Sequence, residues 1–135
     1  MGDLDSIQDN VKQFYEFKGV KVVKSPSQNT NDFEKAFRYA IDKNWRKIIC
    51  LGAFGGRMDH ALSGMNITTK LCRQYQDLEV ILVGRSNLMY YMRPNVKHEI
   101  TISSDISRKG CGIVRFGSNV KVKTKGFKWN LGPDK

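Results

Sequence analysis

As far as residue 84, segments with helical periodicity alternate with short apolar segments of strand type. Helical patterns cover residues 6–19, 31–44 and 60–75, and strand-type runs cover residues 20–23, 46–52 and 78–84. Strands that are separated by helices usually pair in parallel, so we expect an α/β layer with a mainly parallel sheet. The last two runs are almost wholly apolar, and we expect both strands to be buried.

The pattern changes near residue 86. Short, roughly alternating strand patterns separated by Gly, Pro, Asn and Ser occupy residues 87–92, 98–102, 112–117 and 119–124. We therefore expect an α/β part over residues 1–86, followed by an all-β, sandwich-like part over residues 87–135. The first part starts like the end of a strand and the second is small, so we expect both ends of this fold to be incomplete.

The charge balance favours a polyanionic partner. Lys and Arg number 23 against 13 Asp and Glu, giving a net charge of +10. The basic residues are scattered, however, and an ordinary solvated surface explains them better than a nucleic-acid-binding stripe. No apolar run is long enough to cross a bilayer, so we expect no membrane association. The three cysteines are widely spaced, which indicates a reduced, cytoplasmic protein without a zinc site.

The first acidic pair is Asp3 and Asp5 in "GDLDS". In an extended backbone, residues two apart point to the same side, so these carboxylates would lie together. Two hard oxygen ligands suit Mg²⁺, which keeps several waters and shares its other positions with substrate phosphates. The structural alternative is that Ser6 caps the following helix and that Asp3 is a turn residue.

A third carboxylate, Asp32, follows the loop "PSQNTN" at the start of a helix. An acidic residue there interacts favourably with the helix dipole, which is a sufficient structural explanation. The functional alternative places Asp32 at the carboxyl edge of the sheet, where α/β proteins bind ligands. Lys35, one turn further on, would then face a phosphate.

The segment "LGAFGGRMDH" joins a strand to a helix through a cluster of glycines. Gly55 and Gly56 permit the close approach of backbone amides to an anion, and Arg57 can bind phosphate oxygens with two hydrogen bonds. Asp59 is a candidate for capping the helix, binding a metal-bound water or accepting a proton. His60 is either a phosphate donor or an ordinary surface imidazole. The G-x-x-x-x-G-K-[S/T] pattern of a P-loop is absent.

Trp129, in "TKGFKWNL", follows a glycine turn in the β part. Tryptophans in strands are usually core or interface residues, but one beside a ligand site can stack on a flat cationic ring.

Four segments in the same order resemble motifs of the thiamine pyrophosphokinase family, and together they span nearly the whole chain. The family motifs are G-D-x-D-S, Q-D-x-T-D-F-x-K, G-G-R-x-D-H/Q and T-T-G-L-K-W-N-L. Here they read "GDLDS", "QNTNDFEK", "GGRMDH" and "TKGFKWNL". The resemblance implies a homodimeric enzyme that transfers pyrophosphate from ATP to thiamine, giving thiamine diphosphate and AMP.

The resemblance also implies roles for individual residues. Asp3, Asp5 and Asp32 would hold Mg²⁺ and serve catalysis, together with Arg57, Asp59 and His60. The phosphate site would be lined by Gln28, Lys35, Gly55, Gly56, Arg57, Asp59 and His60, and Trp129 would lie against the thiamine rings. The chain departs from the motifs at Asn29 and Asn31, which replace Asp and Thr, and at Lys125, which replaces Thr. A catalytically incomplete relative and a basic nucleic-acid-binding module are the alternatives.

Overall fold

The computed structural model describes residues 1–26, 29–101, 103, 110–116 and 120–132. The chain divides into two compact units, Met1–Tyr91 and Met92–Lys135. In the described part of the chain, no helix is long and apolar enough to cross a membrane.

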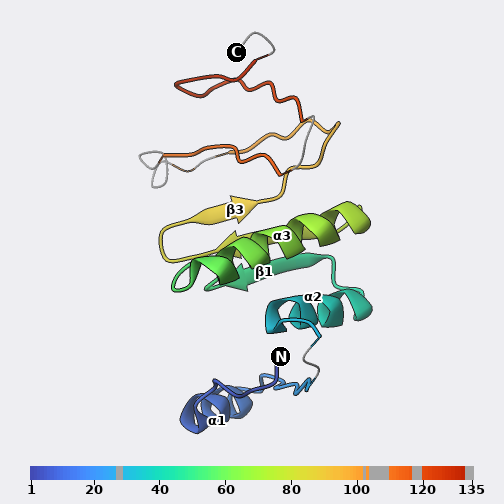
Figure 1. Cartoon of the computed structure of the whole chain (residues 1–135), viewed down its shortest axis with the longest axis vertical. Helices are drawn as coiled ribbons and strands as arrows, with labels where there is room; N and C mark the ends of the chain where they lie inside the picture. Colours follow the sequence, from blue (N-terminus) through green and yellow to red (C-terminus); the bar gives the residue numbers. More distant parts are fainter. Residues whose placement is uncertain (27–28, 102, 104–109, 117–119, 133–135) are drawn as a thin grey trace. The chain divides into compact units, whose positions relative to one another are not determined.

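The first unit contains all the helices and strands that are assigned among the described residues (Figure 1). In chain order they are α1 (Asp9–Phe17), α2 (Asp32–Asp42), β1 (Lys47–Leu51), α3 (Met58–Gln74), β2 (Glu79–Val83) and β3 (Leu88–Tyr90). The three expected helices and the strands at 46–52 and 78–84 are therefore confirmed in kind. The strand expected at residues 20–23 is wrong, because no strand is assigned to that described segment and the isolated parallel bridge beside it joins Lys24 to Gly2.

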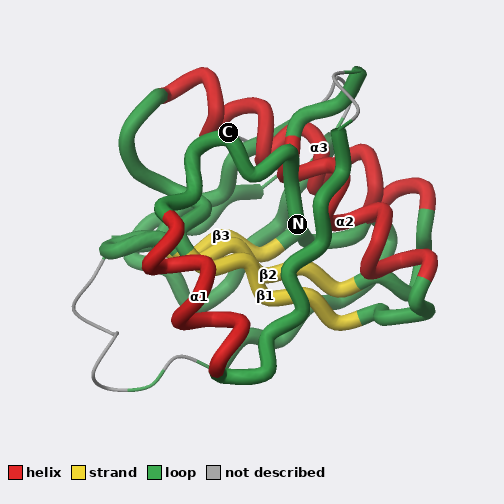
Figure 2. The backbone as a smooth tube through the Cα atoms, turned by 90° about the horizontal axis from the view of Figure 1, so that it is seen from below, coloured by secondary structure: helices red, strands yellow, loops and turns green. Residues whose placement is uncertain are grey.

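The sheet is small and mixed rather than mainly parallel. Its strand order is β1-β2-β3, with β1 and β2 parallel and β3 antiparallel to β2. Three strands lie side by side in the centre of Figure 2. β3 comes from the segment that the sequence assigns to the β part, yet it extends the sheet of the first unit.

The hydrophobic core lies between one face of this sheet and the helices α2 and α3. The helices contribute Phe37 and Leu71, which are 2% and 0% exposed. Register places Ile48 beside Val80 and Cys50 beside Leu82, so these alternate side chains share the core face. The periodicity of α2 and α3 predicts this arrangement, because their apolar residues recur on one side of each helix.

The other face of the sheet is apolar and largely uncovered. Ile49 is 65% exposed and Leu51 is 81% exposed, although both belong to β1. The expectation that this strand is buried is therefore wrong for one of its faces, since β1 lies at the edge of the sheet with helices against the other face. An open apolar groove of about 340 Å³ runs along β1 beside Phe33 and Phe37 of α2.

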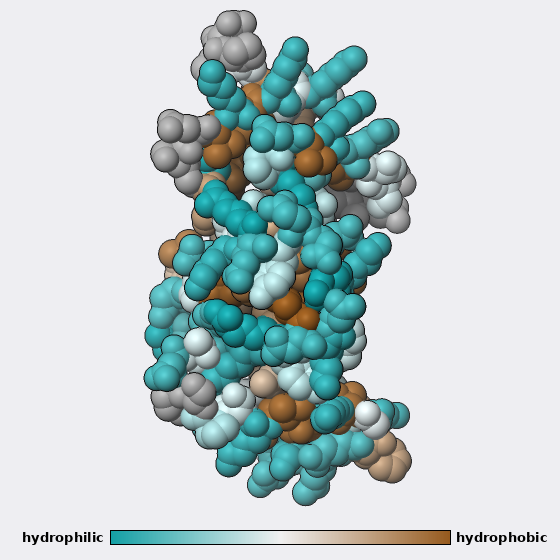
Figure 3. Space-filling view, turned by 90° about the vertical axis from the view of Figure 1, so that its right-hand side faces the viewer, coloured by the Kyte–Doolittle hydropathy of each residue, from teal (hydrophilic) through white to brown (hydrophobic). Residues whose placement is uncertain are grey.

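Helix α1 has an apolar side without a core beneath it. None of its residues is buried, and Phe14 and Phe17 are exposed. Apolar side chains accordingly gather over this end of the first unit, in the lower part of Figure 3.

The second unit carries no assigned strand or helix among its described residues up to 132. The sandwich-like all-β part therefore stays a prediction, and the segments predicted to be strands there lie partly outside the described residues. The boundary placed at residues 86 and 87 also stays a prediction.

Candidate functional site

The N-terminal segment pairs with residues 23–25 through one isolated parallel bridge at Gly2. The Gly2 amide donates to the Val23 carbonyl at 3.2 Å, and the Ser25 amide donates to the Gly2 carbonyl at 2.7 Å. Asp3 directly follows the paired Gly2 and is half-buried. The parallel pairing of two distant segments therefore fixes where the first acidic residue lies.

Asp3 and Asp5 do not share one side of an extended strand. Leu4 between them has a φ of +66°, in the left-handed region, so the backbone turns at this point. The Asp5 amide donates to Asp3 Oδ1 at 3.3 Å, and a hydrogen bond from the Ser6 hydroxyl lowers the pKa of the exposed Asp5 carboxyl. The extended geometry expected from the spacing is therefore wrong, and the pair forms a local turn.

Asp32 lies against the N-terminal segment. Both of its carboxylate oxygens accept from the Asp3 amide at 3.3 Å, and Lys35 Nζ lies 2.7 Å from Oδ1. A Cβ on Gly2 would overlap this carboxylate, coming within 2.7 Å of its Cγ. Glycine at position 2 thus leaves the space that brings Asp32 beside Asp3.

Among the residues that the structure describes, no group of three His, Cys, Asp or Glu side chains is close enough to hold a metal ion. The three-carboxylate magnesium site therefore stays a prediction. The chemistry of the ligands still fits Mg²⁺, because Asp3, Asp5 and Asp32 offer hard oxygen atoms and Mg²⁺ is often held by only one or two carboxylates.

Lys35 is the most buried charged residue near this segment. Its side chain is 6% exposed, and Nζ also donates to the Ser25 carbonyl at 3.3 Å. The ammonium thus faces the protein rather than solvent. Gln28, the other residue expected to line the phosphate site from this motif, lies outside the described residues.

The N-termini of α2 and α3 meet through a pair that sequence reasoning missed. Asn31 Oδ1 accepts from the Glu34 amide at 2.9 Å and caps α2, while Asn31 Nδ2 donates to Ser63 Oγ at 3.0 Å. Ser63 stands four residues after Asp59 on α3, so helical spacing places it on the same side of the helix as Asp59, one turn further along, and could have signalled its position. Asn31, one of the departures from the motif, therefore caps α2.

Arg57, Asp59 and His60 lie at the start of α3. Gly55 and Gly56 before them have φ angles of +141° and +64°. Arg57 donates two hydrogen bonds to Asp59, from Nε to Oδ1 at 3.1 Å and from Nη2 to Oδ2 at 2.6 Å. These bonds raise the pKa of Arg57 and lower that of Asp59. His60 is exposed.

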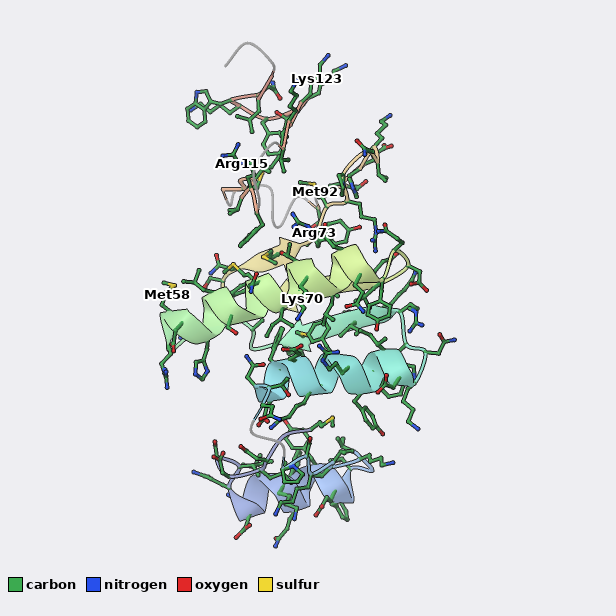
Figure 4. All side chains as sticks on the ribbon, turned by 45° about the vertical axis from the view of Figure 1, so that its right-hand side comes forward. Met58, Lys70, Arg73, Met92, Arg115 and Lys123 are labelled. Carbon is green, nitrogen blue, oxygen red and sulfur yellow. The ribbon has the colours of Figure 1, made fainter. Side chains whose placement is uncertain are left out.

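Towards the other end of α3, Lys70 lies 3.9 Å from Glu34 of α2, and Figure 4 shows it on the α2 side of the helix. Together with the Asn31–Ser63 bond, this contact joins the two helices at two levels. Asp32, the first residue of α2, and Arg57, the N-cap of α3, thus stand at the N-termini of two helices that contact each other.

Trp129 belongs to a closed loop in the second unit. The Thr124 amide donates to the Leu131 carbonyl at 2.9 Å, and Asn130 bonds both the amide and the carbonyl of Phe127. The Trp129 ring is 75% exposed, with Lys128 Nζ 4.5 Å from its centroid. The loop therefore presents an aromatic face that accepts a cation.

The first unit is an α/β unit that carries acidic and basic side chains at its helix N-termini, and the second unit presents an exposed aromatic side chain. The family model "Thiamin pyrophosphokinase, catalytic domain" matches residues 1–82, and "Thiamin pyrophosphokinase, vitamin B1 binding domain" matches residues 97–134. The chain belongs to the thiamine pyrophosphokinase family.

Individual relatives agree with this assignment. Thiamine pyrophosphokinase 2 of Oryza sativa subsp. japonica is 34% identical over 142 residues, covering 99% of this chain and 52% of the relative. Thiamine pyrophosphokinase 2 of Arabidopsis thaliana is 31% identical over 138 residues, covering 96% and 50%. The solved thiamin pyrophosphokinase of Candida albicans superposes with a TM-score of 0.51 at 25% identity, covering 62% of this chain and 40% of that one. The chain thus spans about half the length of the curated relatives it matches.

Proposed function

We propose that this protein takes part in making thiamine diphosphate, by transferring a pyrophosphoryl group from ATP to thiamine. The thiamine hydroxyl oxygen attacks the β-phosphorus of ATP, the bond from that phosphorus to the α-phosphate oxygen breaks, AMP leaves, and the hydroxyl proton is released. The observation that carries the proposal is the Asp32 carboxylate held between Lys35 and the Asp3 amide, at the motif that the family resemblance singles out.

The acidic residues supply the proposed cation site. Asp3, Asp5 and Asp32 would hold Mg²⁺, which when bound neutralises phosphate charge and orients the group that is transferred. The carboxylate of Asp32 is already turned towards the segment that carries Asp3, which supports their acting together.

The basic residues supply the proposed phosphate contacts. In this structure the Arg57 guanidinium binds Asp59, whose two carboxylate oxygens stand in for the two phosphate oxygens that Arg57 would bind in a nucleotide. Exchange of Asp59 for a phosphate frees that carboxylate, with His60 beside it, for the reacting hydroxyl or a metal-bound water. Gly55 and Gly56 leave the approach to this helix N-terminus open.

The aromatic loop supplies the proposed thiamine contact. The exposed Trp129 ring offers a π-face to the thiazolium cation, worth about 0.5–2 kcal/mol. We also propose a homodimer, as the resemblance implies, and a cytoplasmic location, which the three thiol cysteines Cys50, Cys72 and Cys111 support. Sedimentation velocity tests the dimer.

The deciding experiment is a calorimetric titration of the chain with thiamine, with and without a non-hydrolysable Mg-ATP analogue. Binding of both ligands supports the proposal, and Asp32→Asn is expected to remove metal-dependent nucleotide binding while circular dichroism stays unchanged. Unchanged binding by Asp32→Asn would contradict the role of that carboxylate. A folded protein that binds neither ligand would be a catalytically incomplete relative.

A further inference from the structure

We infer that Lys35 is a positioning residue for the Asp32 carboxylate, and not a direct ligand of the substrate phosphates. The inference deepens the proposed function and rests on it, because it concerns how Asp32 is presented to a divalent cation. It also departs from the sequence-based expectation, in which the Lys35 ammonium faces a phosphate.

The burial of Lys35 is the first step. A side chain that is 6% exposed leaves little room for a triphosphate to reach its ammonium group. Burying an ammonium is costly unless it is paired and hydrogen-bonded, and here it has both kinds of partner. Asp32 Oδ1 at 2.7 Å supplies the opposite charge, and the Ser25 carbonyl at 3.3 Å accepts a second hydrogen bond.

The second step is that the two carboxylate oxygens of Asp32 have different hydrogen-bond partners. Lys35 binds Oδ1, whereas among the described residues Oδ2 accepts only the Asp3 amide, at 3.3 Å, which it shares with Oδ1. Because Lys35 lies one turn along the same helix, its bond fixes the rotation of the carboxylate. Oδ2 is then the oxygen left for a cation, and it lies beside Gly2 and the Asp3 amide.

The position of Ser25 gives the third step. The Ser25 amide donates to the Gly2 carbonyl at 2.7 Å, and Gly2 immediately precedes Asp3. Lys35 therefore bonds Asp32 directly. It is linked to Asp3 indirectly, because it bonds the Ser25 carbonyl and the Ser25 amide bonds Gly2, the residue before Asp3. One buried ammonium thus sets the relation between two of the three proposed cation ligands.

The test is Mn²⁺ titration followed by electron paramagnetic resonance, on the wild-type protein, Lys35→Met, Lys35→Arg and Lys70→Met. Lys70→Met is the matched control, because it removes the same charge from a 60% exposed lysine 3.9 Å from Glu34. We expect Lys35→Met to weaken Mn²⁺ binding about tenfold or more, with partial rescue in Lys35→Arg and little change in Lys70→Met.

Whether Lys35→Met weakens or strengthens Mn²⁺ binding distinguishes a positioning residue from a phosphate ligand. Removing a positive charge beside a carboxylate strengthens cation binding if nothing else happens, so weaker binding reports lost positioning. If Lys35 were a phosphate ligand, Lys35→Met would keep or strengthen Mn²⁺ binding and weaken pyrophosphate binding, and the inference would be overturned. If the wild type binds neither Mn²⁺ nor thiamine, the proposed function fails and this inference fails with it.

A measurement on the wild type covers the case in which Lys35→Met does not fold. In protein labelled with ¹⁵N at lysine, the Lys35 Nζ signal is expected to exchange slowly with water, to shift on adding Mg²⁺, and to stay in place on adding pyrophosphate alone. A Lys35 signal that exchanges as fast as that of Lys70 would contradict the buried pairing.

Discussion

Gly2 controls how closely the backbone passes the Asp32 carboxylate. A Cβ at this position would overlap the carboxylate, so Gly2→Ala must push either Asp32 or the N-terminal segment away. We expect the change to weaken Mn²⁺ binding and to lower the free energy of unfolding by about 1–3 kcal/mol, as overpacking usually does. Urea unfolding and Mn²⁺ titration measure the two effects.

The control for this substitution is Gly112→Ala, where an added Cβ meets nothing within 4 Å and no left-handed φ is required. It should leave both quantities within error. Equal effects of the two substitutions would show that glycine at position 2 matters for chain flexibility and not for space beside Asp32.

Two adjacent buried threonines of α3 differ in one hydrogen bond. Thr68 Oγ1 is buried and has no hydrogen-bond partner among the residues that the structure describes, whereas Thr69 Oγ1 donates to the Met65 carbonyl at 2.9 Å. Thr68→Val replaces an unsatisfied hydroxyl with a methyl group of similar size, so we expect it to raise the free energy of unfolding by about 1 kcal/mol. Thr69→Val should give a smaller gain or a loss in the same urea titration, and the reverse order would contradict this account.

Cys50 and Cys111 should differ in reactivity because burial raises the pKa of the Cys50 thiol from 9.0 to about 11. Alkylation proceeds through the thiolate, so near pH 8.5 iodoacetamide should modify the exposed Cys111 well before Cys50, as read by peptide mass spectrometry. Since the folded state holds this proton more tightly, the associated stability is present below pH 9 and is lost as pH rises towards 11. Equal alkylation rates at native pH would contradict the assigned burial.

At the scale of elements, Asn31 serves two helices at once. Its Oδ1 caps α2 at the Glu34 amide, and its Nδ2 bonds Ser63 on α3. We expect Asn31→Ala to lower the free energy of unfolding by about 1 kcal/mol or slightly more, as loss of an N-cap does. Asn31→Thr restores the family residue and should recover the cap, but not the amide donor to Ser63.

A double-mutant cycle isolates the second bond. If Asn31 Nδ2 and Ser63 are coupled, Asn31→Thr and Ser63→Ala should be non-additive in urea unfolding. Additive effects would show that Asn31 acts on α2 alone.

The helices could be predicted from the sequence because their apolar periodicity follows from one local rule, and α2 carries it at Phe33, Phe37 and Ile41. Strands depend on distant partners, which is why "VKVV" reads as a strand but is assigned none, with a single isolated bridge at the following residue, Lys24. The exposure of Ile49 on β1 could not be predicted for the same reason, since burial of a strand face depends on what packs over it.

The sequence predicts which residues belong to the candidate site, but not which of their side chains contact one another. Motif spacing identifies Asp32 and Arg57 as candidate site residues. It does not predict that Arg57 pairs with Asp59, or that the Lys35 ammonium is buried. The first depends on side-chain rotamers at the start of α3, and the second on burial that arises only when α2 and the N-terminal segment meet. The left-handed Leu4 is a similar case, because leucine gives no local signal for a turn.

At the scale of the whole molecule, the two family models fall one in each compact unit, residues 1–82 in the first and residues 97–134 in the second. The proposed nucleotide and thiamine contacts are therefore divided between units, with Asp32 and Arg57 in one and Trp129 in the other. The net charge of +10 belongs to the chain as a whole and acts on both ligands, but with opposite signs, because Mg-ATP is an anion and thiamine is a cation.

This opposition leads to a prediction about salt. Raising NaCl from about 50 to about 300 mM shortens the screening distance, so we expect binding of the Mg-ATP analogue to weaken by about three- to tenfold. Thiamine binding should stay constant or strengthen slightly, because screening removes repulsion between two positive partners. Calorimetric titrations of each ligand at both salt concentrations measure this difference directly.

The same titration with a single-stranded homopolymeric RNA tests the nucleic-acid alternative. A basic binding module releases about one counterion for each phosphate that it neutralises, so several phosphate contacts give a steep dependence of affinity on salt, with tight binding at low salt. The acidic residues Asp3, Asp5 and Asp32 at the proposed site disfavour a polyphosphate backbone that brings no metal ion with it. We expect weak RNA binding that thiamine does not compete with; tight RNA binding, together with salt-independent binding of the Mg-ATP analogue, would favour the module over the pyrophosphokinase.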